Sequence, residues 1–186
     1  IEVFGAHNLS NLGGAKWICQ NMGVDEADFY EAIATFKGAS KRLEKIAESN
    51  DKVAYKDFAH SPSKVAATTK AVKAQYPNRK LVACLELHTY SSLNAEFLKE
   101  YQGALDAADV AVVFYSPDAV KIKRLEEVTY DQIAQSLQKE NLIIYTNPAE
   151  YKEFLFNQNL DNSALLLMSS GNYGGLNFDE VKGLIN

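Results

Sequence analysis

Four short runs of consecutive apolar residues constrain the fold of this chain more than any other feature. They read VACLEL (82–87), VAVVF (110–114), LIIY (142–145) and ALLLM (164–168). Each run has the length of a strand and is apolar at successive positions, which is typical of strands covered by helices on both faces. Segments of helical length separate them, at 62–76, 93–105, 129–139 and 148–157, and a last helix is expected from about 177. This alternation predicts an α/β fold with a doubly wound, mainly parallel, Rossmann-like sheet.

The first forty residues have a different pattern. A helix is expected over 8–21, with an apolar stripe that includes Trp17 and Met22, and a second helix over 25–36. The segment FKGASKR then combines Gly38 with small residues, which favours a hinge or domain boundary. Two short strands around a polar turn follow, at 43–48 and 52–58. We therefore expect a helical unit over residues 1–38 and a sheet domain over residues 39–186. Because the first residue is Ile1 and not Met, we also expect that an upstream segment has been removed.

Composition excludes several classes of protein. The chain has 186 residues, 47% hydrophobic and 23% charged, which suits a packed core. Its formal net charge is −5 and it has no long basic run, so we expect no nucleic-acid binding. No stretch approaches the roughly 20 apolar residues of a membrane helix, and no signal peptide is recognisable. Cys19 and Cys84 form no disulfide framework, which predicts a cytoplasmic location, and Cys84 is expected to be a buried free thiol.

Candidate chemistry lies in the loops after the strands, because ligands of parallel sheets bind at the carboxyl ends of the strands. The three histidines, His7, His60 and His88, each follow a strand-like run, although an ordinary loop contact would explain any single one. A metal site made from them is not favoured, because no HxH, HxxxH or CxxC spacing occurs. A serine hydrolase would need a GxSxG turn, and a stand-alone triphosphate site would need GxxxxGK[ST]; both motifs are absent.

Two segments can be interpreted as nucleotide contacts or as helix caps. In GAHNLSN (5–11), asparagine side chains can hydrogen-bond an edge of adenine, but capping by Asn8 or Ser10 would also explain them. In DFAHSP (57–62), Asp57 can bind ribose hydroxyls, and the helix N-terminus that follows can face an anion. Ser61 and Pro62 are equally ordinary capping residues.

Two further segments suit a polar substrate. LHTYSS (87–92) is rich in hydroxyl groups, although Ser92 could simply cap the next helix. MSSGNYGG (168–175) is a Gly-rich turn, whose glycines let the backbone approach a ligand or adopt a positive φ. A turn of this kind is not specific by itself.

Taken in order, four segments resemble the Mur ligases, which build and recycle bacterial peptidoglycan precursors. GAHNLSNLGGA resembles the family's G-x-H-N-x-x-N-x-x-A segment, and FKGASKRLE resembles its F-x-G-x-x-R-x-E segment. KDFAHSPSKV resembles D-[YF]-[AG]-H-x-P, and LELHTYSS occupies the place of a P-H-x-[YF]-[ST]-R-like segment. The resemblance covers essentially the whole chain, and the order and spacing of the four segments make it specific.

This resemblance implies that the chain is part of a three-domain ligase. In the family, MgATP phosphorylates a carboxylate of a UDP-N-acetylmuramate substrate, and an amine attacks the acyl phosphate to give an amide, ADP and phosphate. Residues 1–38 would be the tail of the central domain, which holds the phosphate loop and the magnesium ligands, and residues 39–186 the C-terminal domain. No metal ligand is expected in this chain. The implied partners are UDP-N-acetylmuramate, an amino acid or peptide, and the N-terminal and central domains of the same protein.

The resemblance also implies roles for individual residues. The nucleotide-binding residues would be His7, Asn8, Asn11, Arg42 and Asp57. Among these, Arg42 would approach the phosphates and Asp57 the ribose. His60 would lie next to the reaction centre as a catalytic residue. The amine substrate would be bound by His88, Ser91, Ser92, Ser170 and Asn172.

The chain departs from the family pattern at the third histidine. Leu87 stands in place of a proline, and Ser91 or Ser92 in place of an arginine, so the contacts with the amine differ from the family pattern. The ending MSSGNYGGL is closer to the M-S-N-G-x-[FY]-G-G of members that add the tripeptide L-alanyl-γ-D-glutamyl-meso-diaminopimelate in recycling than to the G-A-G-x-I-G of L-alanine ligases. We therefore expect a tripeptide ligase, with an L-alanine ligase as the alternative. The other class considered is a non-catalytic module that binds a nucleotide or peptide; folylpolyglutamate ligases match less well.

Overall fold

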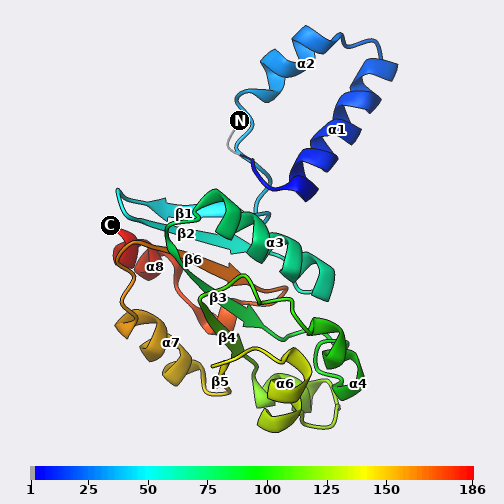
Figure 1. Cartoon of the computed structure of the whole chain (residues 1–186). Coiled ribbons are helices and arrows are strands. Elements are labelled where there is room, and N and C mark those ends of the chain that lie inside the picture. Colours follow the sequence, from blue (N-terminus) through cyan, green and yellow to red (C-terminus); the bar gives the residue numbers. More distant parts are fainter. Residues whose placement is uncertain (1–2) are drawn as a thin grey trace.

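The sheet has the predicted doubly wound character. The computed structural model describes residues 3–186, so Ile1 and the expectation attached to it lie outside the described residues. Within these residues, six strands form one sheet in the order β1-β2-β6-β3-β4-β5 (Figure 1). The strands are β1 (Glu44–Glu48), β2 (Lys52–Asp57), β3 (Lys80–Glu86), β4 (Val110–Phe114), β5 (Ile143–Tyr145) and β6 (Ser163–Met168). β1 pairs antiparallel with β2, and the other pairs are parallel. The mainly parallel α/β fold is therefore confirmed.

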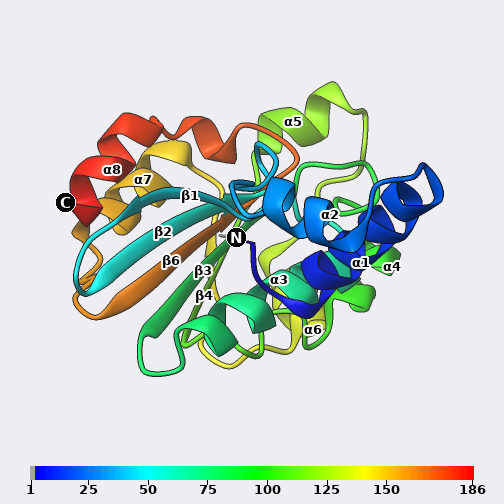
Figure 2. The ribbon, with the colours of Figure 1, turned by 90° about the horizontal axis from the view of Figure 1, so that it is seen from above.

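Helices cover both faces of this sheet (Figures 1 and 2). The core on one face includes side chains from α3 (Pro62–Gln75), α4 (Ala95–Leu98), α5 (Pro117–Ile122) and α6 (Tyr130–Leu137). The core on the other face includes side chains from α7 (Pro148–Asn157) and α8 (Phe178–Ile185). Two short 3₁₀ turns, η1 (Lys99–Tyr101) and η2 (Tyr173–Gly175), complete the fold.

Strand β3 shows why apolar residues occur at successive positions. Leu81 and Leu85 enter the core on the α3 side, whereas Val82 and Cys84 enter the core on the α7 side. Successive side chains of a strand point to opposite faces, so a strand covered on both sides needs apolar residues throughout. The buried free thiol expected at Cys84 is confirmed, and burial raises its pKa to about 12.

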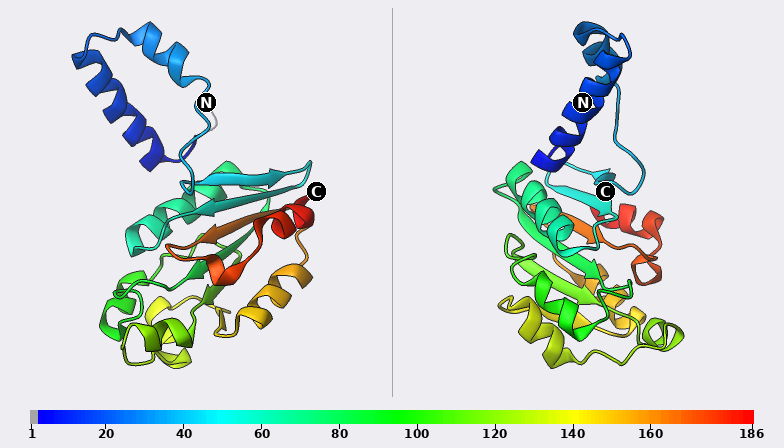
Figure 3. Two further views of the ribbon diagram at one scale, coloured as in Figure 1. Left: turned by 180° about the vertical axis from the view of Figure 1, so that it is seen from behind. Right: turned by 90° about the vertical axis from the view of Figure 1, so that its right-hand side faces the viewer.

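The first two helices form an arm that projects from the β1 side of the sheet (Figures 1 and 3). They are α1 (Ala6–Asn21) and α2 (Glu26–Ile33). α1 buries none of its residues: Trp17 is 67% exposed, and Met22, which follows the helix as its C-cap, is 79% exposed. The apolar stripe predicted for this helix therefore does not pack against the sheet. No helix in the described part of the chain is long and apolar enough to span a membrane.

Some local expectations are wrong. The helix expected over 93–105 is limited to α4 and η1, because Gln102 leaves the helical region with ψ 126° and Gly103 follows with φ 74°. α5 was not anticipated, although Ser116 and Pro117 occupy its N-cap and first position.

The capping interpretations hold only at the start of α3. There Ser61 is the N-cap residue and Pro62 the first helical residue, although the Ser61 side chain makes no cap bond. α1 begins at Ala6, so Asn8 and Ser10 lie inside the helix, and the Asn8 side chain donates to the Phe4 carbonyl at 3.0 Å. Asn94 rather than Ser92 caps α4. Capping therefore does not account for Asn8, Ser10 or Ser92.

Candidate functional site

The candidate site lies at the carboxyl edge of the sheet. Because β2, β6, β3 and β4 are parallel neighbours, the loops that follow them emerge at the same edge. β6 lies between β2 and β3. The Gly-rich turn at 169–175 therefore separates the loop that carries Asp57 and His60 from the loop that carries His88.

A cavity of about 600 Å³ opens between α1, the linker before β1 and the start of α3. Its lining consists of His7, Asn8, Asn11, Arg42, Asp57, Ser63, Lys64, Ala67 and Thr68. The five residues that the sequence assigned to a nucleotide are all in this lining. They come from three segments that are distant in the sequence, and the fold brings them together. Their role in nucleotide binding stays a prediction.

Asp57 ends β2 and ties the linker to the sheet. Its carboxylate is buried, with Oδ2 accepting from the Leu43 N–H at 2.6 Å and Oδ1 from the Ala59 N–H at 2.5 Å. Burial raises the pKa of Asp57, against the opposing effects of these two N–H groups and of the charges on His7 and Arg42. Each carboxylate oxygen has a second lone pair, so Asp57 can still accept a hydrogen bond from a molecule in the cavity.

His60 is oriented by its own loop. Its Nδ1 lies 2.8 Å from the Phe58 carbonyl oxygen, and its own carbonyl accepts from the Tyr101 hydroxyl. A carbonyl can only accept, so Nδ1 carries the proton, and Nε2 of the neutral ring keeps a lone pair. The Phe58 ring also meets the His60 ring edge-on at 5.0 Å and lies 5.0 Å from the Arg42 guanidinium carbon. The Phe58 ring therefore contacts both the Arg42 guanidinium and the His60 ring, which is a potential base.

A second cavity, of about 350 Å³, adjoins the first and shares Asn8, Asn11 and Arg42 with it. The rest of its lining is mostly apolar and consists of Val3, Leu12, Ala15, Ile33, Phe36, Gly38 and Ala39. Apolar walls with a few polar groups are typical of sites for small organic ligands. Gly38 lies in the linker between α2 and β1 and has φ 99°, a left-handed backbone conformation that favours glycine.

The residues of the loop after β3 that are predicted to bind the amine differ in their exposure to solvent. Ser92 is only 1% exposed, and its hydroxyl accepts from the Thr89 N–H at 3.0 Å. The Ser92 N–H donates in turn to the Thr89 hydroxyl at 3.1 Å. Ser92 therefore shapes the loop, and the direct substrate contact expected of it stays a prediction. Ser91 is exposed, and His88 is half-buried at the start of the loop.

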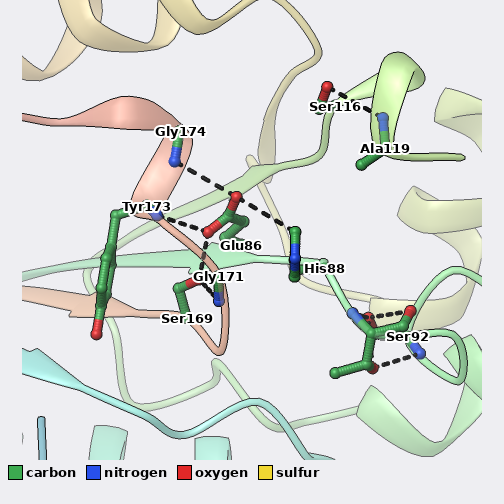
Figure 4. Close-up of polar contacts among 10 residues, drawn as sticks. Glu86, His88, Ser92, Ser116, Ala119, Ser169, Gly171, Tyr173 and Gly174 are labelled. Carbon is green, nitrogen blue, oxygen red and sulfur yellow. Dashed lines mark hydrogen bonds and ion pairs between the residues drawn. The ribbon is translucent and has the colours of Figure 1, made fainter. Parts of the chain in front are cut away.

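The Gly-rich turn is held by a carboxylate of the protein itself (Figure 4). Glu86, the last residue of β3, accepts from the Ser169 hydroxyl, from the Tyr173 N–H at 2.7 Å and from the Gly174 N–H at 3.4 Å. The glycines of the turn are expected to let the backbone approach a ligand or adopt a positive φ. Gly174 and Gly175 do have positive φ values, of 69° and 79°, and the N–H groups of Tyr173 and Gly174 bind Glu86. Ser170 has a buried hydroxyl without a hydrogen-bond partner, and Asn172 is exposed.

Comparison with known proteins identifies the family. The family model described as "Mur ligase, glutamate ligase domain" matches residues 41–171, more than half of the chain. This chain belongs to the Mur ligase family. The UDP-N-acetylmuramate–L-alanine ligase of Microcystis aeruginosa is 32% identical over 179 residues. That match covers 92% of this chain and 37% of the relative, so the chain spans little more than a third of the relative's length.

Solved structures agree with this Mur ligase assignment. A UDP-N-acetylmuramate–alanine ligase of Thermotoga maritima has the same fold, with a TM-score of 0.70 and 20% identity over 98% of this chain and 37% of that one. A domain described as coming from a UDP-N-acetylmuramate:L-alanyl-γ-D-glutamyl-meso-diaminopimelate ligase of Haemophilus ducreyi is 25% identical, with a TM-score of 0.51. It covers 77% of this chain and 99% of its own.

Sequence reasoning missed several residues of this Mur ligase site. Ser63, Lys64 and Thr68 line the larger cavity. Lys64 and Thr68 are four residues apart on α3, and that spacing places both on one helix face and could have indicated them. Glu86 was read as part of an apolar run, although a single carboxylate between Leu85 and Leu87 was a signal in itself.

The side chains around the larger cavity include both charged and hydrogen-bonding groups. Among residues 3–186, no group of three or more His, Cys, Asp or Glu side chains could hold a metal. The larger cavity does offer the cations and hydrogen-bonding groups that phosphates and a ribose require.

Proposed function

We propose that this Mur ligase domain is the C-terminal part of an ATP-dependent ligase that joins an amine to the carboxyl group of UDP-N-acetylmuramate. The observation that carries the proposal is the convergence of residues from α1, the linker and the β2–α3 loop on one cavity. We further propose that residues 1–38 belong to the central domain and residues 39–186 to the C-terminal domain. The exposed apolar side chains of α1 support this division, because helices of a packed domain normally bury such a stripe.

In this proposal the two adjoining cavities share one ATP molecule. The smaller cavity has apolar walls for the adenine ring, with Asn8 and Asn11 able to hydrogen-bond its edge. Asp57 would accept from ribose hydroxyls, and Arg42 and Lys64 would lie along the phosphates. Guanidinium and ammonium groups form charge-assisted hydrogen bonds with phosphate oxygens, which are among the stronger polar contacts in proteins.

The residues near Arg42 fit the chemistry of amide formation. ATP would transfer a phosphoryl group to the carboxylate, the amine would attack the carbonyl carbon, and the bond to the phosphate oxygen would break. The attacking amine must lose a proton, which Nε2 of His60 would accept, because Nδ1 is bonded to the Phe58 carbonyl. An acyl phosphate hydrolyses readily, so the site must exclude water, and rotation about the linker at Gly38 would close it.

For the amine we propose the tripeptide L-alanyl-γ-D-glutamyl-meso-diaminopimelate. The support is the MSSGNYGGL ending and the 25% identity to the Haemophilus ducreyi domain. L-Alanine is the second candidate, favoured by the 32% identity to the Microcystis aeruginosa ligase.

The test is phosphate release by the full-length protein with MgATP and UDP-N-acetylmuramate, with L-alanine and the tripeptide offered in parallel. Release that depends on both UDP-N-acetylmuramate and the tripeptide is the expected result. Release with L-alanine alone would replace the tripeptide assignment and keep the ligase assignment. Absence of release with either amine, from a folded full-length protein, would refute the proposed function.

A further inference from the structure

Glu86 ends β3, which pairs with β6, and its buried carboxylate has no role in the proposed chemistry. Glu86 is 6% exposed. Burying a carboxylate is costly unless hydrogen bonds compensate for the lost water. Three donors do so here: the Ser169 hydroxyl and the backbone N–H groups of Tyr173 and Gly174. All three belong to the turn at 169–175, so Glu86 fixes the shape of that turn.

The two oxygens of Glu86 have different surroundings (Figure 4). Oε2 accepts the Ser169 hydroxyl and the Tyr173 N–H, the latter at 2.7 Å. Oε1 has only a long contact of 3.4 Å with the Gly174 N–H and lies 3.9 Å from Nδ1 of His88. Within the described part of the chain, His88 is the only ion-pair partner that the structure gives to Glu86. One oxygen therefore holds the turn, and the other faces the histidine.

His88 is confined from the other side by Gly171. A Cβ atom at Gly171 would lie 2.7 Å from Cγ of the His88 ring, so the ring lies directly against the backbone of the turn. The Gly171 N–H donates to the Ser169 hydroxyl at 2.7 Å, and that hydroxyl donates to Glu86. The histidine side chain is still 37% exposed, so it can meet a molecule from solvent.

We propose that Glu86 is a positioning residue for the amine substrate. It holds the turn at 169–175 closed, and its Oε1, 3.9 Å from Nδ1 of His88, holds the imidazole ring in place to bind a carboxylate of the amine. The proposal rests on the proposed function, and it covers both candidate amines, because L-alanine and the tripeptide each carry a free carboxylate. A carboxylate that binds beside Glu86 needs a donor to offset the like-charge repulsion, and the His88 ring lies next to Glu86 with N–H groups that can donate.

The test is Glu86→Gln in the full-length protein. The amide oxygen can keep the two bonds made by Oε2, while the amide nitrogen replaces Oε1 and removes the charge that faces His88. We expect the KM for the amine to rise roughly 10- to 100-fold, the loss associated with a charge-assisted hydrogen bond. The KM values for ATP and UDP-N-acetylmuramate should change less than about twofold, within ordinary surface effects. The matched control is Glu96→Gln, which removes a carboxylate that is 84% exposed and should leave all three KM values unchanged.

The route through His88 is tested by a double-mutant cycle. If Glu86 acts through His88, then Glu86→Gln adds little in a His88→Gln background, because the group it positions is already gone. Fully additive effects of the two substitutions would overturn that route. An unchanged amine KM in Glu86→Gln would overturn the positioning role itself. Amidated substrate gives a further check: the preference for the carboxylate form over the amide form should fall in Glu86→Gln.

Hydrogen exchange of residues 169–175 separates this proposal from the proposed function, because it needs no activity. Glu86→Ala should lose protection at the Tyr173 amide, and Glu86→Gln should retain it. Equal protection in wild type and Glu86→Ala would show that Glu86 does not hold the turn. If the wild-type protein used neither amine, the proposed function would fail, and this measurement would still decide the structural half of the inference.

Discussion

Replacing Gly171 with alanine should disturb the amine side of the site and spare the nucleotide side. The added Cβ would lie 2.7 Å from Cγ, 2.9 Å from Nδ1 and 3.0 Å from Cδ2 of the His88 ring. Nonbonded carbon atoms prefer separations of roughly 3.5–4.0 Å, so the ring must retreat by about 0.8 Å or more. Gly171 does not have a positive φ, so the effect of the substitution is steric and not conformational.

The destabilisation caused by Gly171→Ala depends on how freely the His88 ring can move away. Overpacking a core typically costs about 1–3 kcal/mol. His88 is 37% exposed and can rotate into solvent, which favours the lower end, about 1 kcal/mol. For a chain of this size, that corresponds to a fall in Tm of roughly 2–4 °C. Rotation also breaks the alignment of His88 with Glu86, so we expect the amine KM to rise about tenfold, the equivalent of roughly 1.4 kcal/mol.

Two measurements check this reasoning. Thermal unfolding of the 186-residue chain gives the stability term, and initial rates of the full-length protein give KM for each substrate. Gly183→Ala is the matched control, because a Cβ at this α8 position meets no atom within 4 Å; it should stabilise the helix by up to about 1 kcal/mol. An unchanged Tm together with an unchanged amine KM in Gly171→Ala would show that His88 does not lie against Gly171. An equal rise in the KM for ATP would show a global rather than a local effect.

Three further predictions concern other parts of the chain. Asp57→Ala in the full-length protein should raise the KM for ATP, since it removes a carboxylate from the cavity; unchanged kinetics would remove Asp57 from the nucleotide site. The purified 186-residue chain should form no ADP from ATP in a coupled assay, because it carries no phosphate loop; detectable ADP would contradict this. Thr129→Ala should cost about 1 kcal/mol in chemical denaturation, because it removes the capping box with Gln132 at the start of α6; a midpoint equal to wild type would show that the box contributes nothing.

The fold could be predicted where the signal was local. Strands such as β3 are apolar on both faces, and that pattern can be recognised from consecutive residues in the sequence. The order of strands is not local. β6 comes last in the sequence yet lies between β2 and β3, and no pattern in residues 163–168 records that position. The short helix α5 was missed because only the Ser116–Pro117 pair marks its start.

The same distinction between local and long-range signals applies to the candidate site. The cavity residues Asn8, Arg42 and Asp57 belong to recognisable motifs, so they could be named before the fold was known. The partners of Glu86 could not, because they lie in the turn, 83 to 88 residues away. Ser92 is assigned to the substrate because it lies in a hydroxyl-rich segment that resembles a family motif, whereas its burial depends on how the loop folds back on Thr89.

Because β6 lies between β2 and β3, the turn that follows it can hydrogen-bond to the ends of both neighbouring strands. The Ser169 N–H and the Tyr173 hydroxyl both donate to the Asp57 carbonyl at 3.0 Å, while the Tyr173 N–H donates to Glu86 at 2.7 Å. Burial, aided by the nearby charges of Asp57 and Glu86, raises the pKa of Tyr173, so its hydroxyl stays protonated and remains a donor at neutral pH. The turn thus bonds to the ends of both β2 and β3 and sets the spacing between the cavity at Asp57 and His88. In the proposed reaction, amide formation would depend on that spacing, because an amine misplaced by about 1 Å can react on the order of a hundredfold more slowly.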